Sequence, residues 1–449
     1  MFSKILIANR GEIAVRVIRA CREMGISTVA IYSQADQNAL HVNLADESIC
    51  VGPAPAKDSY LNMEAILSAA VCTGAQAIHP GYGFLSESAR FARLCEKCNI
   101  AFIGPPAEVI SRMGDKDAAK RAMREAGVPV IPGCDAVDDL ETAKQHAKRV
   151  GFPLLVKAKA GGGGRGIRLV EKPEDFENAY LHASNEAFLA FGDGGLYIEK
   201  FLSPTKHIEM QMLCDRHGNV VCLGERECSI QRKNQKLLEE TPSPSVTEAT
   251  RKKMMEAAIG ASKAVGYQNA GTLEFLMDAK GGFYFMEMNT RLQVEHPVTE
   301  MVTGIDLVKW QIRVAAGQPL GFTQKEIKLN GCAMECRINA ENPSMSFRPS
   351  SGRISLLHVP GGPWVRFDSA VYQDYVVPPF YDSMLGKLIV HAKTREEAIR
   401  KMQAALCELV VEGIDHNSQL QMDILQTPEF QQGNYFTDFM QKQSWHKSF

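Results

Sequence analysis

The sequence predicts a fold of the α/β and α+β classes. It places a parallel α/β unit first, a small domain with a glycine-rich loop second and a larger mixed domain last. Three observations predict this order. Strands and helices alternate over the first hundred residues, a glycine-rich loop lies between two strands near residue 160, and a β-hairpin near residue 280 carries acidic residues on both strands. At 449 residues, the chain has room for about two to four domains.

The first unit is expected over residues 1–103. Strands are predicted at 5–8, 28–32, 77–79 and 101–103, with helices at 12–24, 60–70 and 86–97. This alternation is typical of a parallel sheet with helices on both faces. Gly104-Pro-Pro106 ends the unit, and a helix over 107–127 forms a connector that spans 104–130.

Composition excludes several classes of function. The chain is 45% hydrophobic and 23% charged with a net charge of −2, so neither nucleic acid nor an anionic membrane is an expected partner. No apolar run approaches the length of a membrane span, and residues 1–8 indicate a first strand rather than a signal peptide. The twelve cysteines include one isolated Cys95-x-x-Cys98 pair, which favours reduced thiols over a zinc site. A cytoplasmic protein is therefore expected.

The second unit, residues 131–203, contains the glycine-rich loop. A strand over 154–156 leads into the Gly161–Gly166 stretch, and a strand over 167–170 leaves it. Glycines let backbone N–H groups approach phosphates closely, so the loop is predicted to be a lid over a nucleotide. Lys157 is placed to meet phosphate oxygens. A Walker loop is excluded because no Gly-Lys-Ser/Thr follows, and a flexible linker is disfavoured by the strands on both sides.

The hairpin over 270–289 predicts a cation site. A turn at Lys280-Gly281 pairs Glu274 with Glu287, and residues directly opposite each other lie about 5 Å apart. Facing carboxylates repel unless a cation lies between them. With Asn289 nearby, the oxygen ligands favour Mg²⁺ or Mn²⁺, which would hold substrate phosphates. A one-residue slip would instead place the acids in water.

Residues 287–296 extend this site. If the segment is extended, alternate side chains share one face: Glu287, Asn289, Arg291, Gln293 and Glu295. Burying such a row without ligands would be costly, so a functional site is favoured over a solvent-facing edge strand. This segment belongs to a mixed domain over 204–449, in which 371–387 is expected to form strand–loop–strand and 395–412 a helix.

Six motifs carry a resemblance to a known family. They occupy residues 7–14, 79–87, 113–116, 161–166, 287–300 and 379–384. In their order and spacing the chain resembles biotin carboxylase over nearly its whole length. The resemblance implies an ATP-grasp fold, a homodimer, and nucleotide held between the lid and the large domain. Length and content are similar to the free-standing subunit of bacterial-type acetyl-CoA carboxylase, since no Met-Lys-Met biotinylation motif and no carboxyltransferase region is present.

The family reaction has two stages. ATP, with Mg²⁺ or Mn²⁺, phosphorylates bicarbonate to carboxyphosphate, which breaks down to CO₂ and phosphate. Biotin on a biotin carboxyl carrier protein then captures CO₂ through its N1 atom. Carboxyltransferase subunits complete the formation of malonyl-CoA for fatty acid synthesis.

The resemblance implies roles in bicarbonate binding and activation for residues within 287–296 and for Lys236. Bicarbonate is a poor nucleophile until a base removes its proton, and Glu295 is the expected base. Arg291 offers a planar fork for two carbonate oxygens. Lys236, Gln293 and the backbone of Val294 are expected to bind the same anion.

Arg337 matches the family residue that stabilises the biotin enolate. In this family the released phosphate is thought to deprotonate biotin. A base pair formed by Cys228 and Lys236 is the weaker alternative, because an ordinary thiol is mostly protonated near neutral pH.

The remaining expected contacts are to the nucleotide and the metal. Lys116 and Lys157 are expected at the phosphates, with Gly163 and Gly164 closing over them. The adenine edge is assigned to Glu199, Lys200 and Leu202, the cleft lining to His207 and Gln231, and the metal to Glu274, Glu287 and Asn289, of which the two glutamates also contact ATP.

Three positions depart from the family pattern. Asn234 stands where family members often have His, so its nucleotide contact keeps hydrogen bonding but loses charge. Lys159 and Ala160 replace residues before the glycine loop and are expected to alter the mobility of the lid.

Other functions stay open at this stage. The same motifs occur in the biotin carboxylase parts of propionyl-, pyruvate- and methylcrotonyl-type carboxylases, and the hairpin and loop alone also fit a more distant ATP-grasp ligase. A non-catalytic nucleotide-binding subunit would not need Arg291, Glu295 and Arg337 together. A dinucleotide-binding oxidoreductase is disfavoured because no GxGxxG follows the first strand.

Overall fold

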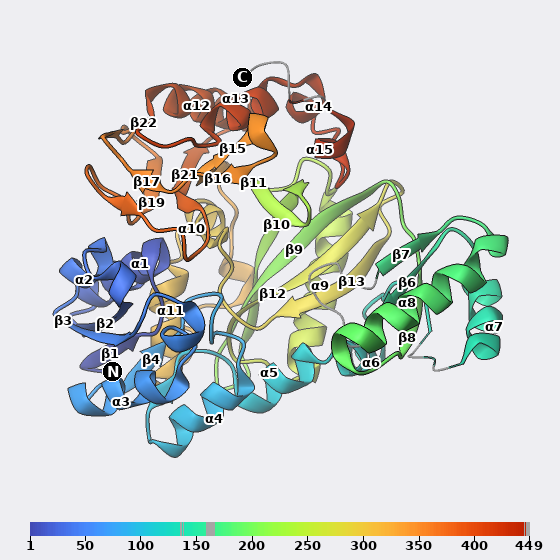
Figure 1. Cartoon of the computed structure of the whole chain (residues 1–449), viewed down its shortest axis with the longest axis horizontal. Coiled ribbons are helices and arrows are strands. Elements are labelled where there is room, and N and C mark those ends of the chain that lie inside the picture. The colour runs from blue at the N-terminus through green and yellow to red at the C-terminus, as the bar shows by residue number, and fades with distance from the viewer. Residues whose placement is uncertain (135–136, 138, 159–166, 444, 446–449) are drawn as a thin grey trace.

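Three parts of the chain surround a central antiparallel sheet. The computed structural model describes residues 1–134, 137, 139–158, 167–443 and 445. In Figure 1 the N-terminal unit is blue, the small domain that follows projects to the right in green, and the C-terminal part is orange to red at the top. The long strands of the central sheet run between them. The glycine loop, including Gly163 and Gly164, lies outside the described residues, as do Lys159 and Ala160.

The N-terminal unit is a five-stranded parallel sheet in the order β3-β2-β1-β4-β5, which confirms the predicted class. Its strands are β1 Lys4–Ile7, β2 Ser27–Ser33, β3 Glu47–Gly52, β4 Ala77–His79 and β5 Ala101–Phe102. Its helices are α1 Gly11–Glu23, α2 Leu40–Leu44, α3 Met63–Thr73 and α4 Ala89–Lys97. The prediction lacked β3 and α2, and it began two helices early. Asn62 and Ser88 cap α3 and α4 by accepting from the backbone N–H groups of Ala65 and Phe91.

The connector contains two helices where one was predicted. They are α5 Ala107–Gly114 and α6 Lys116–Glu125. The break falls at Asp115, whose carboxylate accepts hydrogen bonds from the backbone N–H groups of Asp117 and Ala118 at 3.0 and 2.9 Å. This cap lets a new helix begin at Lys116 and fixes that residue in the first turn.

The small domain, called the lid domain below, is a three-stranded antiparallel sheet in the order β7-β6-β8. Its elements are β6 Leu154–Ala158, β7 Ile167–Val170, β8 Leu196–Lys200, α7 Leu140–Val150 and α8 Phe176–Phe191. The two strands predicted on either side of the glycine loop are therefore present and pair with each other.

The central sheet has eight strands in the order β13-β12-β9-β10-β11-β14-β21-β19. They are β9 Thr205–Cys214, β10 Val220–Arg232, β11 Gln235–Thr241, β12 Asn269–Asp278, β13 Phe283–Asn289, β14 Cys332–Asn339, β19 Val365–Ser369 and β21 Met384–Ala392. In the β12–β13 hairpin Glu274 pairs with Glu287, so the predicted register is confirmed.

The extended segment predicted over 287–296 is wrong beyond Asn289. There β13 ends, and the chain turns through 290–295 before α10 begins at His296. Pro297 lies in the first turn of α10, where its fixed φ angle suits a helix and its missing N–H costs nothing. The polar side chains of 289–295 are thus brought together by a turn and not by strand alternation.

Helices and short strands complete the fold. The helices are α9 Glu248–Ala264, α10 His296–Thr303, α11 Leu307–Ala315, α12 Arg395–Glu408, α13 Ser418–Gln426, α14 Pro428–Gln431 and α15 Phe439–Lys442. The short strands are β15 Glu341–Asn342, β16 Arg348–Pro349, β17 Gly352–Arg353, β18 Leu356–His358, β20 Val376–Val377 and β22 Val410–Glu412. The predicted helix over 395–412 ends at Glu408, and the last residues form β22.

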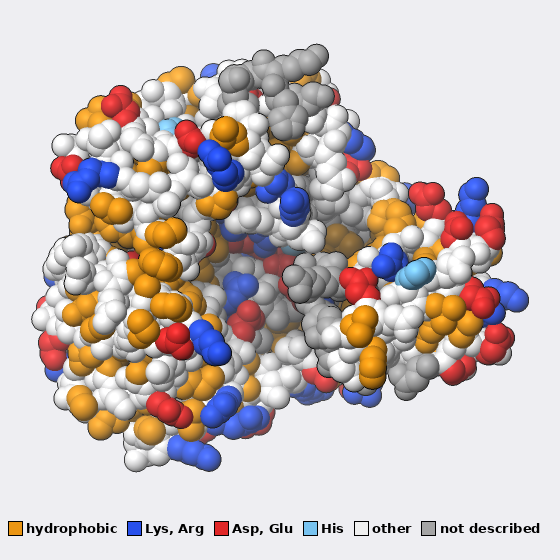
Figure 2. Space-filling view, in the orientation of Figure 1, with side chains coloured by type: hydrophobic (Ala, Val, Ile, Leu, Met, Phe, Trp, Pro, Cys, Tyr) orange, Lys and Arg blue, Asp and Glu red, His pale blue; other side chains and the backbone are white. Residues whose placement is uncertain are grey.

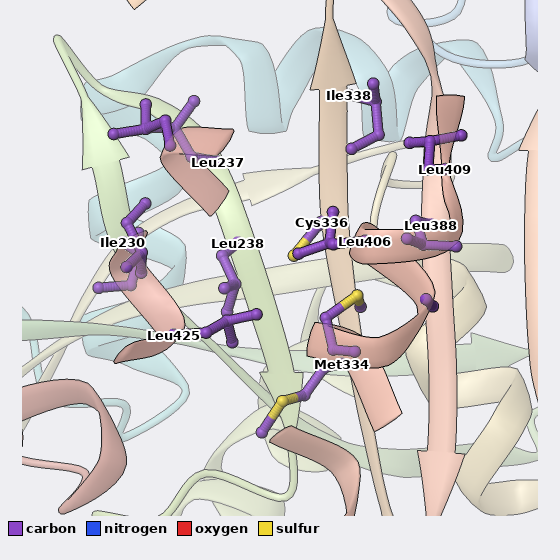
Figure 3. Close-up of a cluster of buried hydrophobic side chains, with 14 of the residues drawn as sticks. Ile230, Leu237, Leu238, Met334, Cys336, Ile338, Leu388, Leu406, Leu409 and Leu425 are labelled. Carbon is purple, nitrogen blue, oxygen red and sulfur yellow. The ribbon is translucent and has the colours of Figure 1, made fainter. Parts of the chain in front are cut away.

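One face of β11, β14 and β21 is a hydrophobic core. Figure 3 shows Leu238, Cys336 and Leu388 of these strands facing Leu406 and Leu425 of α12 and α13. Side chains alternate along a strand, so the residues between these apolar positions face the other side of the sheet. That second face carries Glu239, Glu335, Arg337 and Lys387.

Within the described ranges, no helix combines the length and the apolar character needed to cross a membrane.

Candidate active site

A hollow lies between the N-terminal unit, the central sheet and the lid domain. Figure 2 shows acidic and basic side chains gathered inside it, in contrast to the mixed outer surface. Strands β9 to β14, the 290–295 turn and the start of α10 supply the residues described below.

Lys236 lies at the centre of a group of carboxylates. Its Nζ atom donates to Glu209 at 2.7 Å, to Glu274 at 3.1 Å and to Glu295 at 2.5 Å. Burial alone would lower the pKa of Lys236, but the three carboxylates raise it well above its usual value. The side chain is therefore a fixed positive charge.

Glu295 is the residue before α10 and is fully buried. Its Oε1 atom accepts from Lys236, and its Oε2 atom accepts from Nη2 of Arg337 at 2.9 Å. Burial raises the pKa of a carboxyl group, but here Lys236, Arg337 and Arg226 outweigh burial and hold the pKa of Glu295 well below its ordinary value. Glu295 is thus an ionised carboxylate at neutral pH.

Arg337 joins three parts of the chain. It comes from β14, contacts Glu295 in the turn and donates through Nε to Glu239 of β11 at 2.7 Å. Two carboxylates therefore fix the orientation of its guanidinium group.

Arg291 is held by polar groups on all three of its nitrogens. Nε donates to Glu87 at 2.9 Å, Nη1 to Oε1 of Gln293 at 2.7 Å, and Nη2 to Oδ1 of Asn289 at 3.0 Å. The contact with Glu87 ties the turn to the N-terminal unit.

The predicted metal ligands lie together. Glu274 accepts from the amide groups of Asn289 and Gln293, both at 2.8 Å, and its other oxygen lies 2.9 Å from Nε2 of His207. Burial opposes ionisation of Glu274, but Lys236 and His207 lower its pKa. Its partner Glu287 is open to the cleft.

The pKa of Glu287 shows the strain between the two acids. Desolvation within the cleft and the charges of Glu274 and Glu87 raise it above its ordinary value, against the opposing charges of Lys116 and His207. A divalent cation bound by carboxylate and amide oxygens would relieve this repulsion, so the donor set fits Mg²⁺.

The expected nucleotide contacts lie on the lid side. Lys157 of β6 and Lys120 of α6 both form ion pairs with Glu199 of β8. Lys120 also lies over the ring of Tyr197, 4.3 Å from its centroid. Burial raises the pKa of Glu199, but the two lysines outweigh it and lower the value.

Lys200, which is expected at the adenine edge, is the last residue of β8. Its ammonium group donates to the carbonyls of Gly151 and Phe152 at 3.2 and 2.9 Å, within the lid domain. Leu202 and Gln231 are both partly buried. Gln231 pairs with Lys236 across β10 and β11, which places it at the end of the carboxylate group.

The departure at Asn234 has a local structural reason. Lys233 and Asn234 form the two-residue turn between β10 and β11, with φ angles of 49° and 65°. Such hairpin turns need positive φ at both positions, and Asn adopts this conformation more readily than most residues. Asn234 is exposed at the tip of this turn.

Four residues of the site were missed from the sequence: Glu87, Lys120, Glu209 and Glu239. Two carried a usable signal. Lys120 follows Lys116 by one helical turn, and Glu209 shares a strand face with His207.

Comparisons with known families match three parts of the chain, which together span most of its length. Residues 1–110 match the biotin carboxylase N-terminal domain, residues 115–323 the carbamoyl-phosphate synthase L chain ATP-binding domain, and residues 335–442 the biotin carboxylase C-terminal domain. A biotin carboxylase of Nostoc sp. is 55% identical over 442 residues, covering 98% of this chain and 99% of the relative.

The chain belongs to the biotin carboxylase family.

Solved structures of the family superpose closely. A Campylobacter jejuni biotin carboxylase in complex with a β,γ-ATP ligand has a TM-score of 0.94 and 51% identity, covering 99% of both chains. The dimeric biotin carboxylase domain of Hydrogenobacter thermophilus 2-oxoglutarate carboxylase, with MgADP and bicarbonate, has a TM-score of 0.92 and 51% identity, covering 98% of this chain and 97% of that one.

Family membership confirms several expectations. The fold is the ATP-grasp fold, the chain is an ATP-dependent ligase, and its reaction uses ATP, Mg²⁺ and biotin. The alternatives of an oxidoreductase and of a non-catalytic regulatory subunit are excluded.

Proposed function

We propose that this chain is the biotin carboxylase subunit of an acetyl-CoA carboxylase. It would carboxylate the biotin of a biotin carboxyl carrier protein in the cytoplasm. Carboxyltransferase subunits would then transfer the carboxyl group from biotin to acetyl-CoA and so form malonyl-CoA for fatty acid synthesis. The observation that carries the proposal is the placement of Glu295 between Lys236 and Arg337. In this proposal Glu295 would be the base, Lys236 would bind the anion and Arg337 would stabilise the enolate; their mutual contacts in one buried group support it.

We propose four parts of the chain, at residues 1–103, 104–130, 131–203 and 204–449, and assign the ligand contacts to them as follows. ATP would lie between the lid domain and the central sheet. Lys116 and Lys157 would bind its phosphates, with Gly163 and Gly164 over them, and Glu199, Lys200 and Leu202 would bind the adenine edge. His207, Gln231 and Asn234 would line the same cleft.

Glu274, Glu287 and Asn289 would hold Mg²⁺. The ion neutralises charge on the transferring phosphates. The pairing of Glu274 with Glu287 in the β12–β13 hairpin supports this assignment.

Glu295 would remove the proton from bicarbonate. Its carboxylate is ionised before substrate arrives, because Lys236 and Arg337 stabilise its charge. Bicarbonate would bind beside it, to Lys236, to the amide of Gln293 and to the backbone of Val294. Arg291 would contact its oxygens through the guanidinium fork.

The 290–295 turn, which contains Gln293, Val294 and Glu295, is also held by a residue of β21. Lys387 of β21 is fully buried and donates to the carbonyl oxygen of Val294 at 2.8 Å. It also pairs with Glu12 of the N-terminal unit at 3.1 Å. The 290–295 turn is therefore fixed on both sides before bicarbonate binds, which favours correct orientation of the reactants.

Arg337 would stabilise the enolate of biotin while phosphate, the product of the first stage, removes the N1 proton. Its charge is only partly offset by Glu239 and Glu295, because Glu295 is shared with Lys236. A developing negative charge on the ureido oxygen would therefore be attracted to it.

A second parent complex has specific support. The biotin carboxylase domain of a 2-oxoglutarate carboxylase is as similar to this chain, at 51% identity, as the Campylobacter biotin carboxylase. The acyl specificity of such complexes resides on other polypeptide regions. That structure is a dimer, and we propose a homodimer for this chain as well.

Phosphate release from MgATP tests the activity. The purified chain is assayed with bicarbonate and free biotin each added or omitted, and transfer of radiolabelled bicarbonate to biotin is measured in parallel. Release that requires bicarbonate and rises with biotin supports the proposal, whereas release indifferent to both refutes it. Adding the carrier and carboxyltransferase of the same organism, with acetyl-CoA or 2-oxoglutarate, then identifies the parent complex.

A further inference from the structure

Two glutamates face each other beside Arg337 without a cation between them. Glu239 of β11 and Glu335 of β14 are directly opposite in the antiparallel register, so their Cβ atoms lie about 5 Å apart. Both residues are fully buried. Arg337 follows Glu335 on the same face of β14 and donates to Oε1 of Glu239.

Three oxygen atoms of this pair lack partners. Both carboxyl oxygens of Glu335, and Oε2 of Glu239, form no hydrogen bond to any residue that the structure describes. Two ionised carboxylates in this position would repel each other and would lose their hydration without compensation. A single proton between them removes both costs, because a protonated carboxyl group donates one hydrogen bond.

We infer that Glu335 is a protonated carboxylic acid that donates a hydrogen bond to Oε2 of Glu239 and thereby positions Arg337. Glu239 then carries the single negative charge of the pair, and its other oxygen holds Arg337. Glu335 touches no substrate in this arrangement. It is a positioning residue for the enolate step, and its role rests on the proposed function of Arg337.

The surrounding charges place the proton on Glu335 rather than Glu239. From β14, Arg337 bonds to Glu239, and from the 290–295 turn Glu295 adds a further negative charge. The nearest cation on β21 is Lys387, which is already engaged by Val294 and Glu12. His296 of α10 is neutral, since burial and nearby cations lower its pKa.

The ionisation behaviour agrees with this assignment. Burial raises the pKa of Glu335 well above its ordinary value, and the charge of Glu239 adds to this effect, against the opposing charges of Lys387 and Arg337. Burial also raises the pKa of Glu239, but there Arg337 is the foremost opposing charge and bonds to it directly.

The protonation of Glu335 affects how much of the positive charge of Arg337 is available in the cleft. If both glutamates were ionised, Arg337 would face three carboxylates and its positive charge would be cancelled by its neighbours. With one proton shared, Glu239 and Glu295 remain, and Glu295 is also bound by Lys236. Arg337 then keeps enough positive charge to stabilise an anion in the cleft.

Glu335→Gln and Glu335→Ala test the inference. An amide donates to Glu239 as a protonated acid does, so we expect Glu335→Gln to keep the biotin carboxylation rate within about twofold of wild type. Glu335→Ala leaves Oε2 of Glu239 unpaired, and we expect that rate to fall about tenfold or more. Bicarbonate-dependent ATP cleavage without biotin should be unchanged in both variants, and the pH profile of Glu335→Gln should match wild type between about pH 6 and 9.

Infrared difference spectroscopy measures the proton itself. The carbonyl stretch of a protonated carboxylic acid should disappear in Glu335→Gln, whereas Glu227→Gln, a buried control on β10, should leave that band in place. The inference is overturned if the band is unchanged in Glu335→Gln, or if Gln impairs biotin carboxylation as much as Ala. If Glu335→Ala fails to fold, the Gln variant and its spectrum still decide the matter. A failure of Arg337→Ala to affect the biotin stage would refute the proposed enolate role and leave the spectroscopic result standing.

Discussion

The ammonium nitrogen of Lys236 lies 2.5 Å from Oε1 of Glu295, although the two residues are 59 positions apart in the chain. The same nitrogen binds Glu209 and Glu274, so one cation serves three buried carboxylates. Glu295 receives a second cation, Arg337, on its other oxygen. Glu295 is therefore bound by a cation on each of its oxygens, and both cations are residues expected to contact the substrates.

Glu295→Gln should abolish bicarbonate-dependent ATP cleavage while leaving ATP binding intact. The amide cannot accept a proton from bicarbonate, and loss of a general base typically lowers rates by about 10² to 10⁴. Steady-state phosphate release and equilibrium nucleotide binding measure the two effects. Glu47→Gln, which removes a half-exposed surface carboxylate paired with Lys4, provides the control. Near-normal turnover in Glu295→Gln would refute the assignment of the base.

Arg337→Ala should lower biotin carboxylation more than bicarbonate-dependent ATP cleavage. In the proposed mechanism the guanidinium group would stabilise the ureido oxygen, whereas the phosphoryl step would depend on Lys236 and Arg291. A lost charge-stabilising donor typically costs about 10² to 10³ in rate. Comparing biotin-dependent with biotin-independent phosphate release separates the two stages. Arg353→Ala, at an exposed ion pair, is the matched surface control. An equal loss in both stages would contradict a role confined to the enolate.

Much of the fold followed from local sequence patterns. The parallel sheet, the strands around the glycine loop and the hairpin register between Glu274 and Glu287 were all predictable, because strand periodicity and turn residues determine them locally. Helix starts were less accurate, since the capping side chains of Asn62, Ser88 and Asp115 decide them.

The site was only partly predictable for a different reason. The side chains of residues 289–295 are brought together by a turn. The prediction from sequence grouped the same residues, but it attributed their proximity to the alternation of side chains along one continuous strand, which the structure does not contain there. Glu239 of β11 is brought to Arg337 of β14 by pairing between strands that are distant in sequence. A single-strand pattern contains no information on that pairing, so this partner could be found only in three dimensions.

Lys120→Ala should raise the KM for ATP about tenfold, with little effect on the KM for bicarbonate. Lys120 and Lys157 share the carboxylate of Glu199, which links α6 to the lid domain beside the expected phosphates. Glu199 is buried, so removing Lys120 would leave its carboxylate with Lys157 as its one cationic partner among the described residues. Lys157 would then be held more tightly by Glu199 and drawn away from the nucleotide. Lys144→Ala, on the outer surface of the lid domain, is the control. An unchanged KM for ATP would show that Lys120 has no part in nucleotide binding.

Two buried histidines should make the folded state sensitive to mild acid. Burial lowers the pKa of His41 from 6.5 to about 4 and that of His79 to about 3. Below pH 6.5 the unfolded chain therefore binds protons that the folded chain does not. Stability is complete above that pH and falls toward pH 4, by about 1.4 kcal/mol per pH unit for each histidine.

His79→Asn isolates this effect. Nδ1 of His79 accepts a hydrogen bond from the backbone N–H of Gly81 at 3.0 Å, and an asparagine oxygen can replace that acceptor. Urea unfolding at several pH values should show a smaller loss of free energy between pH 6.5 and 4 in the variant. An identical pH dependence in variant and wild type would mean that His79 is protonated in the folded state.

Arg226 should be the residue of the central sheet whose loss costs the most stability. Its side chain is completely buried and bonds to Glu209, to Gln211 at 2.7 Å and to Thr299 at 2.9 Å, which links β9 and β10 to α10. Arg226→Met keeps the volume but leaves one oxygen of Glu209 uncompensated, and removing one partner of a buried ion pair costs about 3 to 5 kcal/mol. Arg353→Met, at an exposed ion pair with Asp374, should cost about 1 kcal/mol or less.

The double variant Arg226→Met with Glu209→Gln separates charge from packing. If the cost of Arg226→Met comes from the unpaired carboxylate, neutralising Glu209 should recover most of the lost free energy of unfolding, as measured by urea titration. If the losses in unfolding free energy of the two single variants simply add in the double variant, Arg226 stabilises the fold through Gln211 and Thr299 instead. Lys236 also donates to Glu209 in the wild type, and its position depends on that bond. Neutralising Glu209 should therefore weaken bicarbonate-dependent activity even if the double variant recovers its stability.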